Sequence, residues 1–269
     1  MKDSQEVVFI TGCSSGIGKA SACFLAKHNF KVYASSRTPE NIPKHENIYA
    51  VKLDITDRYS VKEAFENIQK IDVLINNAGY GLVSTLEDMD EEEMLNQYEV
   101  NVFGLLRVTK EVIPKMRKQN YGVIINISSF LGRIGLPLLT FYNSSKYAVE
   151  GITDSLRYEL RDFNIRVHSI MPGFFDTNFA RDNLVVNKKT FHPNSPYASL
   201  VSTLTPTIIE QINHGNCASD VSKLILKIIE NDRFVAHVSV GDKARKFIPM
   251  KRELSDEDFE RRVRAYYKL

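Results

Sequence analysis

The chain has 269 residues, near the upper end for a single domain, and we expect one catalytic domain over residues 1–269. Thirty-five basic residues against 33 acidic ones leave a formal charge of +2, which gives no reason to expect a nucleic acid or a membrane surface as a partner. The three cysteines form no CxxC pair, which favours a reducing compartment, and no apolar run approaches the roughly 20 residues that a membrane-spanning helix needs. We therefore expect a cytoplasmic protein.

Short apolar runs alternate with longer segments of helical periodicity, a pattern typical of an α/β fold with a doubly wound parallel sheet of about seven strands and helices on both faces. Strands are predicted at residues 7–11, 31–35, 48–53, 73–76, 122–128, 166–171 and 234–238. Helices are predicted at residues 17–27, 60–69, 91–119 (interrupted at Pro114) and 141–163, with a capped surface helix in 255–269. Ligands of such a sheet bind beyond the carboxyl ends of its strands.

Residues 174–216 lack this alternation and contain Pro193, Pro196 and Pro206. A loop of this length inside a compact domain is usually a lid or a binding segment, so we predict a substrate lid here. We expect about half of its apolar side chains to pack in the core and the other half to line a pocket. A pocket lined by these side chains would suit a bulky apolar alcohol or ketone that is steroid-, retinoid- or lipid-like. These side chains are Phe174, Phe175, Phe179, Leu184, Val185, Val186 and Phe191.

A glycine-rich loop, TGCSSGIG at residues 11–18, joins the first predicted strand to the first predicted helix. Glycines at three of its positions allow a tight turn and a close approach to a pyrophosphate, while the helix N-terminus offers free N–H groups and partial positive charge. The serine hydroxyls of the loop add donors. Such a loop is a weak signal alone, but its place between a first strand and a helix predicts a dinucleotide site.

The second predicted strand is followed by Ser36, Arg37 and Thr38, with no acidic residue. An acid at this point would bind the ribose hydroxyls of NAD and repel a 2′-phosphate, whereas a guanidinium binds phosphate through two parallel hydrogen bonds. The sequence therefore favours NADP (NADPH) over NAD, and a solvated surface arginine is the alternative.

Further motifs follow the loop along the chain: NNAG at residues 76–79, YxxxK at 142–146, and a PG pair at 172–173 followed by Thr177. In this order and over roughly residues 7–240, they resemble the short-chain dehydrogenase/reductase family. The resemblance implies a Rossmann-type fold and hydride transfer between a nicotinamide cofactor and a small-molecule carbonyl or alcohol. It also implies a homodimer or homotetramer.

The resemblance assigns the cofactor contacts. Asp54 would contact the adenine amino group, with helix capping as the alternative, and Asn77 would face the adenosine ribose. Thr177 and the backbone near Phe175 would hold the nicotinamide carboxamide. The full set of expected contacts is Gly12, Ser14, Ser15, Gly16, Ile17, Gly18, Ser36, Arg37, Thr38, Asp54, Ile55, Asn77, Ala78, Gly79, Tyr142, Lys146, Pro172, Gly173, Phe175 and Thr177.

The catalytic prediction centres on Tyr142 and Lys146, which are four residues apart and therefore share one face of a helix. A free tyrosine titrates near pH 10, but a nearby ammonium and the positively charged nicotinamide ring favour the phenolate, which brings proton transfer closer to neutral pH. By resemblance, Ser129 would stabilise the charge that develops on the substrate oxygen, and Lys146 would also bind the nicotinamide ribose. Asn101 would hold a water molecule that links the lysine to solvent.

Two other functions are compatible with parts of this pattern. One is an NADP-binding sensor without turnover, against which the intact serine, tyrosine and lysine argue. The other is a nucleotide-sugar epimerase on a related fold, against which the glycine spacing and the chain length argue. The six histidines are scattered without a zinc-binding spacing, so no metal site is predicted.

Overall fold

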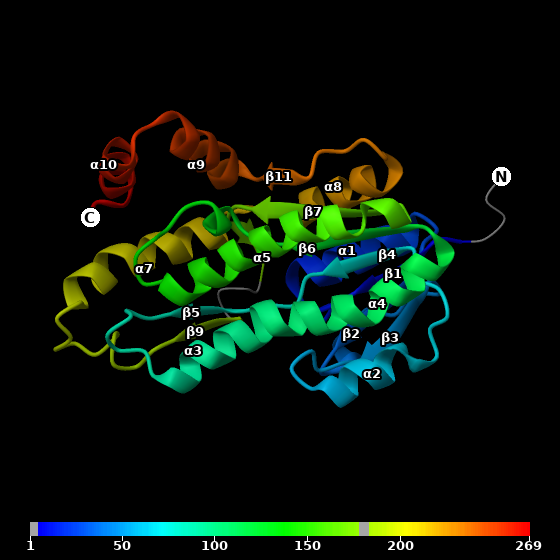
Figure 1. The fold of residues 1–269 in the computed structure, drawn as a ribbon. Coiled ribbons are helices and arrows are strands. Elements are labelled where there is room, and N and C mark those ends of the chain that lie inside the picture. Colours follow the sequence, from blue (N-terminus) through cyan, green and yellow to red (C-terminus); the bar gives the residue numbers. More distant parts are fainter. Residues whose placement is uncertain (1–4, 178–182) are drawn as a thin grey trace.

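The computed structural model describes residues 5–177 and 183–269. Its central sheet is built from β1 (Val7–Ile10), β2 (Lys31–Ser36), β3 (Ile48–Lys52), β4 (Val73–Asn76), β6 (Gly122–Ile127), β7 (Ile165–Pro172) and β11 (His237–Val240). All seven strands are parallel, in the order β11-β7-β6-β4-β1-β2-β3. The chain therefore runs outward from β1 to β3 and then returns to β4 on the other side of β1 (Figure 1). This reversal is the place where doubly wound sheets bind nucleotides, and the predicted Rossmann-type fold is confirmed.

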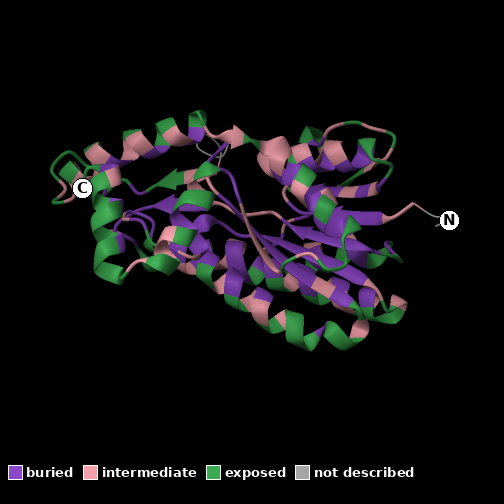
Figure 2. Ribbon diagram, turned by 90° about the horizontal axis from the view of Figure 1, so that it is seen from above, coloured by how far each residue is buried: buried purple, intermediate pink, exposed green. Residues whose placement is uncertain are grey.

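Both faces of this sheet are covered by helices. The side chains of β1 show why its apolar run is continuous: Val8 and Ile10 lie in one core cluster, and Phe9 lies in the cluster on the opposite face. The buried strands run between helices that are partly exposed (Figure 2). On the first face lie α1 (Gly16–Lys27) and α8 (Ala218–Glu230), and on the second lie α2 (Arg58–Glu66), α4 (Leu105–Gln119) and α5 (Thr140–Glu159).

The long helix predicted over residues 91–119 is divided, but not at Pro114. It consists of α3 (Glu91–Tyr98), a π-helical segment η2 (Glu99–Gly104) and α4, and Pro114 lies within α4. The predicted interruption was therefore placed wrongly. Pro114 and Lys110, whose carbonyl loses its helical partner, are both exposed, so water can replace the missing hydrogen bond.

The segment 174–216 is more regular than the predicted loop. It contains β8 (Phe175–Asp176), β9 (Leu184–Val186), the 16-residue helix α7 (Ala198–Asn213) and β10 (Asn216–Cys217). β9 pairs with β5 (Gly81–Val83), and β10 pairs with β8. Pro206 lies within α7 on its exposed side, whereas Leu204, Ile208 and Ile212 on the other side are buried and hold the helix against the domain.

The C-terminal part adds two helices beyond the last strand. β11 begins three residues later than the predicted strand, α9 (Asp242–Glu253) was not predicted, and α10 (Asp256–Tyr267) begins where Ser255 accepts a hydrogen bond from the Asp258 N–H. Phe247 of α9 and Tyr267 of α10 stack with ring centres 6.1 Å apart. Figure 1 shows α7, α9 and α10 beyond the carboxyl end of the sheet. No helix within residues 5–177 and 183–269 is long and apolar enough to cross a bilayer.

Candidate active site

A cavity of about 710 Å³ lies at the carboxyl ends of the strands. It is lined by most of the residues that the sequence assigned to the cofactor and to catalysis. Those that line it are Gly12, Ser14, Ser15, Gly16, Ile17, Ser36, Arg37, Asp54, Ile55, Asn77, Ala78, Gly79, Ser129, Tyr142, Lys146, Pro172, Gly173, Phe175 and Thr177. Three predicted residues are not part of its lining: Gly18, Thr38 and Asn101.

The glycine-rich loop folds tightly against the loop after β4. Gly12 and Gly16 have φ angles of +73° and +56°, which side chains other than glycine rarely adopt. A Cβ atom on Gly18 would lie 2.2 Å from the Gly12 carbonyl oxygen, so this glycine is required by packing within the protein. Ser15 precedes α1 without capping it through its side chain, and the residue lines the cavity. The loop thus exposes the positive N-terminus of α1 to the cavity.

The two asparagines of the NNAG motif hold the sheet and the loop together. Asn76 donates to Thr109 Oγ1 and Asn126 Oδ1, each at 2.9 Å, and so joins β4 to α4 and β6. Asn77 Nδ2 donates to the carbonyl oxygens of Thr11 and Gly12 at 2.9 and 3.0 Å. The amide of Asn77 therefore fixes the glycine-rich loop while the residue lines the cavity.

Arg37 lies exposed just after β2 and lines the cavity. Beside it, the buried Ser36 hydroxyl accepts a hydrogen bond from the Thr38 N–H at 3.2 Å. Asp54 accepts hydrogen bonds from the backbone and the hydroxyl of Thr56, at 2.9 and 2.7 Å. Asp57, not Asp54, caps α2.

Tyr142, Ser129 and Lys146 meet where β6 ends beside α5. Ser129 hydrogen-bonds the Tyr142 phenol, and its Oγ accepts from the Leu131 N–H at 3.1 Å. Lys146 lies one turn after Tyr142, with Nζ 5.8 Å from the centre of the tyrosine ring, and it donates to the Ile127 carbonyl oxygen at 3.0 Å. Ser128 is turned toward the Lys146 carbonyl oxygen instead.

Burial dominates the titration of this pair. It raises the pKa of Tyr142 to about 12, although the hydrogen bond with Ser129 acts in the opposite direction. The expectation that Lys146 and a bound nicotinamide together favour the phenolate stays a prediction. Burial also lowers the pKa of Lys146 to about 8, against the charge of Glu150, which favours the ammonium. A base poised near neutral pH thus requires a further positive charge in the cavity.

Asn101 is buried in η2 and bonded within the protein. Its Nδ2 donates to the Tyr80 carbonyl oxygen at 2.9 Å and to Ser145 Oγ at 3.1 Å, and its Oδ1 accepts from the Tyr80 N–H at 3.0 Å. The side chain thereby ties the turn after β4 to the helix that carries Tyr142. π-Helical turns are frequent at functional sites. The water-holding role stays a prediction.

A model of the short chain dehydrogenase family matches residues 6–185 of this chain. The chain belongs to the short-chain dehydrogenase family. It is 37% identical to a protein of Bacteroides thetaiotaomicron named 3-ketodihydrosphingosine reductase, over 98% of both chains.

Solved structures of short-chain dehydrogenases share the fold. One from Streptomyces avermitilis superposes with a TM-score of 0.84 at 26% identity, covering 98% of this chain and 97% of the other. One from Burkholderia cenocepacia in complex with NADP has a TM-score of 0.77 at 26% identity over 99% of both chains. One from Burkholderia phymatum in complex with NAD has a TM-score of 0.77 at 24% identity, covering 97% and 96%. As a member of this family the chain is an oxidoreductase.

The far wall of this short-chain dehydrogenase cavity is apolar. Of the apolar residues expected in the lid, Phe174, Phe175, Leu184 and Val185 line it. Val186 is exposed outside the lining, Phe191 packs against the C-terminal core, and Phe179 lies outside the described residues.

Other parts of this wall were not predicted from the sequence. Val83, Leu138, Leu139, Ile208, Ile209 and Ile212 also line the cavity. The isoleucines recur at helical spacing in α7, a signal that was available but was obscured by the nearby prolines.

Proposed function

We propose that this short-chain dehydrogenase interconverts a bulky, apolar carbonyl compound and its alcohol with NADP(H). One observation carries the proposal: a single cavity is lined by Arg37, by the Ser129–Tyr142–Lys146 group and by the apolar face of α7. Cofactor, proton donor and substrate would therefore share one enclosed space.

The protein atoms around the cofactor part of the cavity fit a dinucleotide. The glycine-rich loop leaves room for a pyrophosphate at the N-terminus of α1, and the backbone at Gly12 passes so close to Ala78 that a Cβ would lie 2.9 Å from its Cα. NADP is supported by Arg37 and by the absence of an acid from residues 35–38. The NADP bound to the Burkholderia cenocepacia relative agrees with this choice.

The nicotinamide ring, when bound, supplies or accepts the hydride. In the reductive direction, Tyr142 would donate the proton to the substrate oxygen, and Ser129 would hydrogen-bond the same oxygen as negative charge develops on it. Lys146 would bind the nicotinamide ribose and remain close to the phenol.

The substrate part of the cavity favours a long or bulky hydrocarbon. Leu138, Leu139, Leu184, Ile208 and Ile212 contribute aliphatic surface, and β9 and α7 belong to the segment 174–216 that we propose as the substrate lid. The relative named for a keto-sphingoid base reductase, aligned over nearly the whole chain, supports a lipid-derived ketone over a steroid or a retinoid.

A panel of carbonyl compounds tests the proposal. The protein is incubated with NADPH and with acyclic ketones of increasing alkyl length, a 3-keto sphingoid base, a steroid ketone and retinal, while the cofactor absorbance and the products are followed. We expect turnover of the long-chain ketones with NADPH and much slower turnover with NADH. Tight NADPH binding without any turnover would instead support a sensor, and an epimerised sugar nucleotide would support an epimerase.

The assembly is proposed from the family resemblance to be a homodimer or homotetramer of single-domain subunits. Light scattering of the full chain distinguishes these from a monomer. A cytoplasmic location is likewise a proposal, which fractionation of the producing cells would test.

A further inference from the structure

The turn that follows β6 lies along one face of α5 and contacts it at three successive helical turns. Tyr142, Lys146 and Glu150 are four residues apart, so they share that face. Ser129 hydrogen-bonds the Tyr142 phenol, and Arg133 forms an ion pair with Glu150 two helical turns further on. The turn is therefore bonded to the helix at both of its ends.

Between these two contacts the chain forms the short 3₁₀ turn η3 (Phe130–Gly132). The Gly132 N–H donates to the Ser129 carbonyl oxygen at 2.9 Å, which closes the turn on the serine. A Cβ on Gly132 would lie 2.9 Å from the Lys146 carbonyl oxygen, so the backbone of the turn packs directly on α5. Because the turn is this short and this closely packed, a displacement of Arg133 is passed on to Ser129.

The orientation of the Ser129 hydroxyl depends on the same turn. Ser129 Oγ accepts a hydrogen bond from the Leu131 N–H at 3.1 Å. This bond uses the oxygen as an acceptor and leaves the hydroxyl proton for another partner, such as the Tyr142 phenol or a substrate oxygen. Since Leu131 belongs to η3, the position of η3 sets the direction in which the hydroxyl points.

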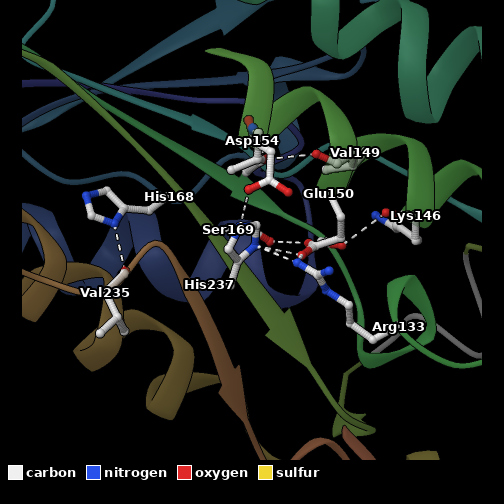
Figure 3. Close-up of polar contacts among 12 residues, drawn as sticks. Arg133, Lys146, Val149, Glu150, Asp154, His168, Ser169, Val235 and His237 are labelled. Carbon is white, nitrogen blue, oxygen red and sulfur yellow. Dashed lines mark hydrogen bonds and ion pairs between the residues drawn. The ribbon is translucent and has the colours of Figure 1, made fainter. Parts of the chain in front are cut away.

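The other end of the turn is held by a carboxylate that is itself fixed from several sides. The Glu150 side chain is 3% exposed, and its Oε2 lies 2.9 Å from Arg133 Nη2 and 2.8 Å from His237 Nδ1. The Ser169 hydroxyl donates to Oε1. Figure 3 shows Arg133, Ser169 and His237 converging on this carboxylate from three different elements. Glu150 therefore offers Arg133 a fixed point of attachment on α5.

We propose that Arg133 and Glu150 are positioning residues of the active site: their ion pair holds the turn in the place that directs the Ser129 hydroxyl to the Tyr142 phenol. The inference rests on the proposed function only in the role given to Ser129. Desolvation offsets much of the stability that a buried ion pair gains. A hydrogen-bonded ion pair nevertheless fixes direction and distance, and these are the properties that a positioned hydroxyl requires.

NMR of the Tyr142 phenol tests the proposal without cofactor or substrate, so its outcome does not depend on whether the proposed reaction is found. The full-length protein is labelled with carbon-13 at tyrosine Cζ, and the Tyr142 signal is assigned by its loss in Tyr142→Phe. Ser129→Ala removes the hydrogen bond and defines the resulting change of chemical shift. We expect Arg133→Met to move the signal in the same direction.

A double-mutant cycle separates positioning from a direct effect of the charge. In Ser129→Ala, the further substitution Arg133→Met should leave the Tyr142 signal where it is, because no hydroxyl remains to be positioned. A guanidinium that acted on the phenol through space, or that only stabilised the fold, would give the same change with and without Ser129.

Two controls use the same cluster. Asp154 Oδ1 lies 2.7 Å from His237 Nε2, the ring nitrogen that does not face Glu150, so Asp154→Asn disturbs the cluster without removing the contact to the turn. It should leave the Tyr142 signal unchanged. Arg133→Lys keeps a cation that can reach the carboxylate, and its signal should stay closer to that of the unsubstituted protein than the signal of Arg133→Met.

Kinetics with a ketone that is turned over supply the second readout. Arg133→Met should lower kcat roughly 10-fold, less than loss of the serine itself, while KM and the Kd for NADPH change little. In Ser129→Ala it should cause no further loss of kcat. An unchanged Tyr142 signal in Ser129→Ala or in Arg133→Met, or equal changes with and without Ser129, overturns the proposal. If Arg133→Met does not fold, Glu150→Asp, which withdraws the carboxylate by one methylene group, is measured by the same criteria.

Discussion

Lys146 Nζ lies 5.8 Å from the centre of the Tyr142 ring and donates to the Ile127 carbonyl oxygen, so the lysine is held beside the phenol. Both groups are buried, and burial moves their pKa values apart: the pKa of Tyr142 rises to about 12 and that of Lys146 falls to about 8. Burial therefore disfavours the charged form of each group. A bound, positively charged nicotinamide would favour the phenolate and complete the site.

Replacing Tyr142 with phenylalanine removes the proposed proton donor and little else. We expect kcat to fall at least about 100-fold, the lower range for loss of general acid catalysis, while the Kd for NADPH changes less than about threefold. Steady-state kinetics and fluorescence titration with NADPH measure the two quantities. Retained turnover would show that another group transfers the proton.

Lys146→Met tests the cost of burying the ammonium. The pKa of Lys146 is lowered from 10.5 to about 8 on folding, so between these pH values the unfolded chain binds more protons, and the folded state gains stability as pH rises. The methionine variant lacks this gain. From pH 7 to pH 10.5 the free energy of unfolding of the unsubstituted protein should rise by about 3 kcal/mol relative to the variant.

Urea unfolding of both proteins at a series of pH values measures this difference. At each pH, the free energy of unfolding must be compared between the two proteins, because other groups, including Tyr142, also titrate in the alkaline range. A difference that is constant with pH would mean that folding does not change the pKa of Lys146.

Arg37→Ala tests the choice of cofactor. Loss of a guanidinium–phosphate contact should weaken NADPH by roughly 10- to 100-fold, and NADH binding should change little because NADH has no 2′-phosphate. Arg261→Ala, at an exposed position on α10, serves as the matched control and should affect neither cofactor. If the substitution weakened the binding of both cofactors equally, Arg37 would not bind the 2′-phosphate.

Gly18→Ala and Gly151→Ala differ only in their surroundings. A methyl group on Gly18 would lie 2.2 Å from the Gly12 carbonyl oxygen and 2.5 Å from Asn77 Nδ2, so the glycine-rich loop must shift and NADPH binding should be lost. A Cβ on Gly151 of α5 would meet no atom within 4 Å outside its own helical turn, and alanine there should stabilise the helix by up to about 1 kcal/mol. Thermal unfolding and NADPH titration of both variants make the comparison.

The sequence predicted the sheet well because burial on both faces of β1 and β6 leaves a continuous apolar run that is hard to misread. The glycine-rich loop was predicted because its constraints are local: Gly12 needs a positive φ angle. Helices were harder to predict where a proline lies on an exposed face, as at Pro206. Water can replace the missing backbone hydrogen bond there, so the helix continues past the proline. The pKa of Tyr142 depends on its burial, which no motif encodes.

The last prediction concerns the apolar wall of the cavity, where we propose that the substrate binds. Ile208 lies on α7, is 8% exposed and lines the cavity, so tryptophan at this position should fill space that a long alkyl chain would occupy. The kcat/KM for long-chain ketones should fall about 10- to 100-fold relative to short ones, the range found when a few methylene groups lose their pocket. NADPH affinity should be unchanged, because the glycine-rich loop and Arg37 lie on other elements. Ile225→Val on α8, in the core cluster that α8 shares with α1 and the sheet, is the control for small losses of stability and should preserve chain-length preference. If Ile208→Trp lowers turnover of short and long ketones equally while NADPH binding persists, the alkyl chain does not run along α7, and the proposed position of the substrate is wrong.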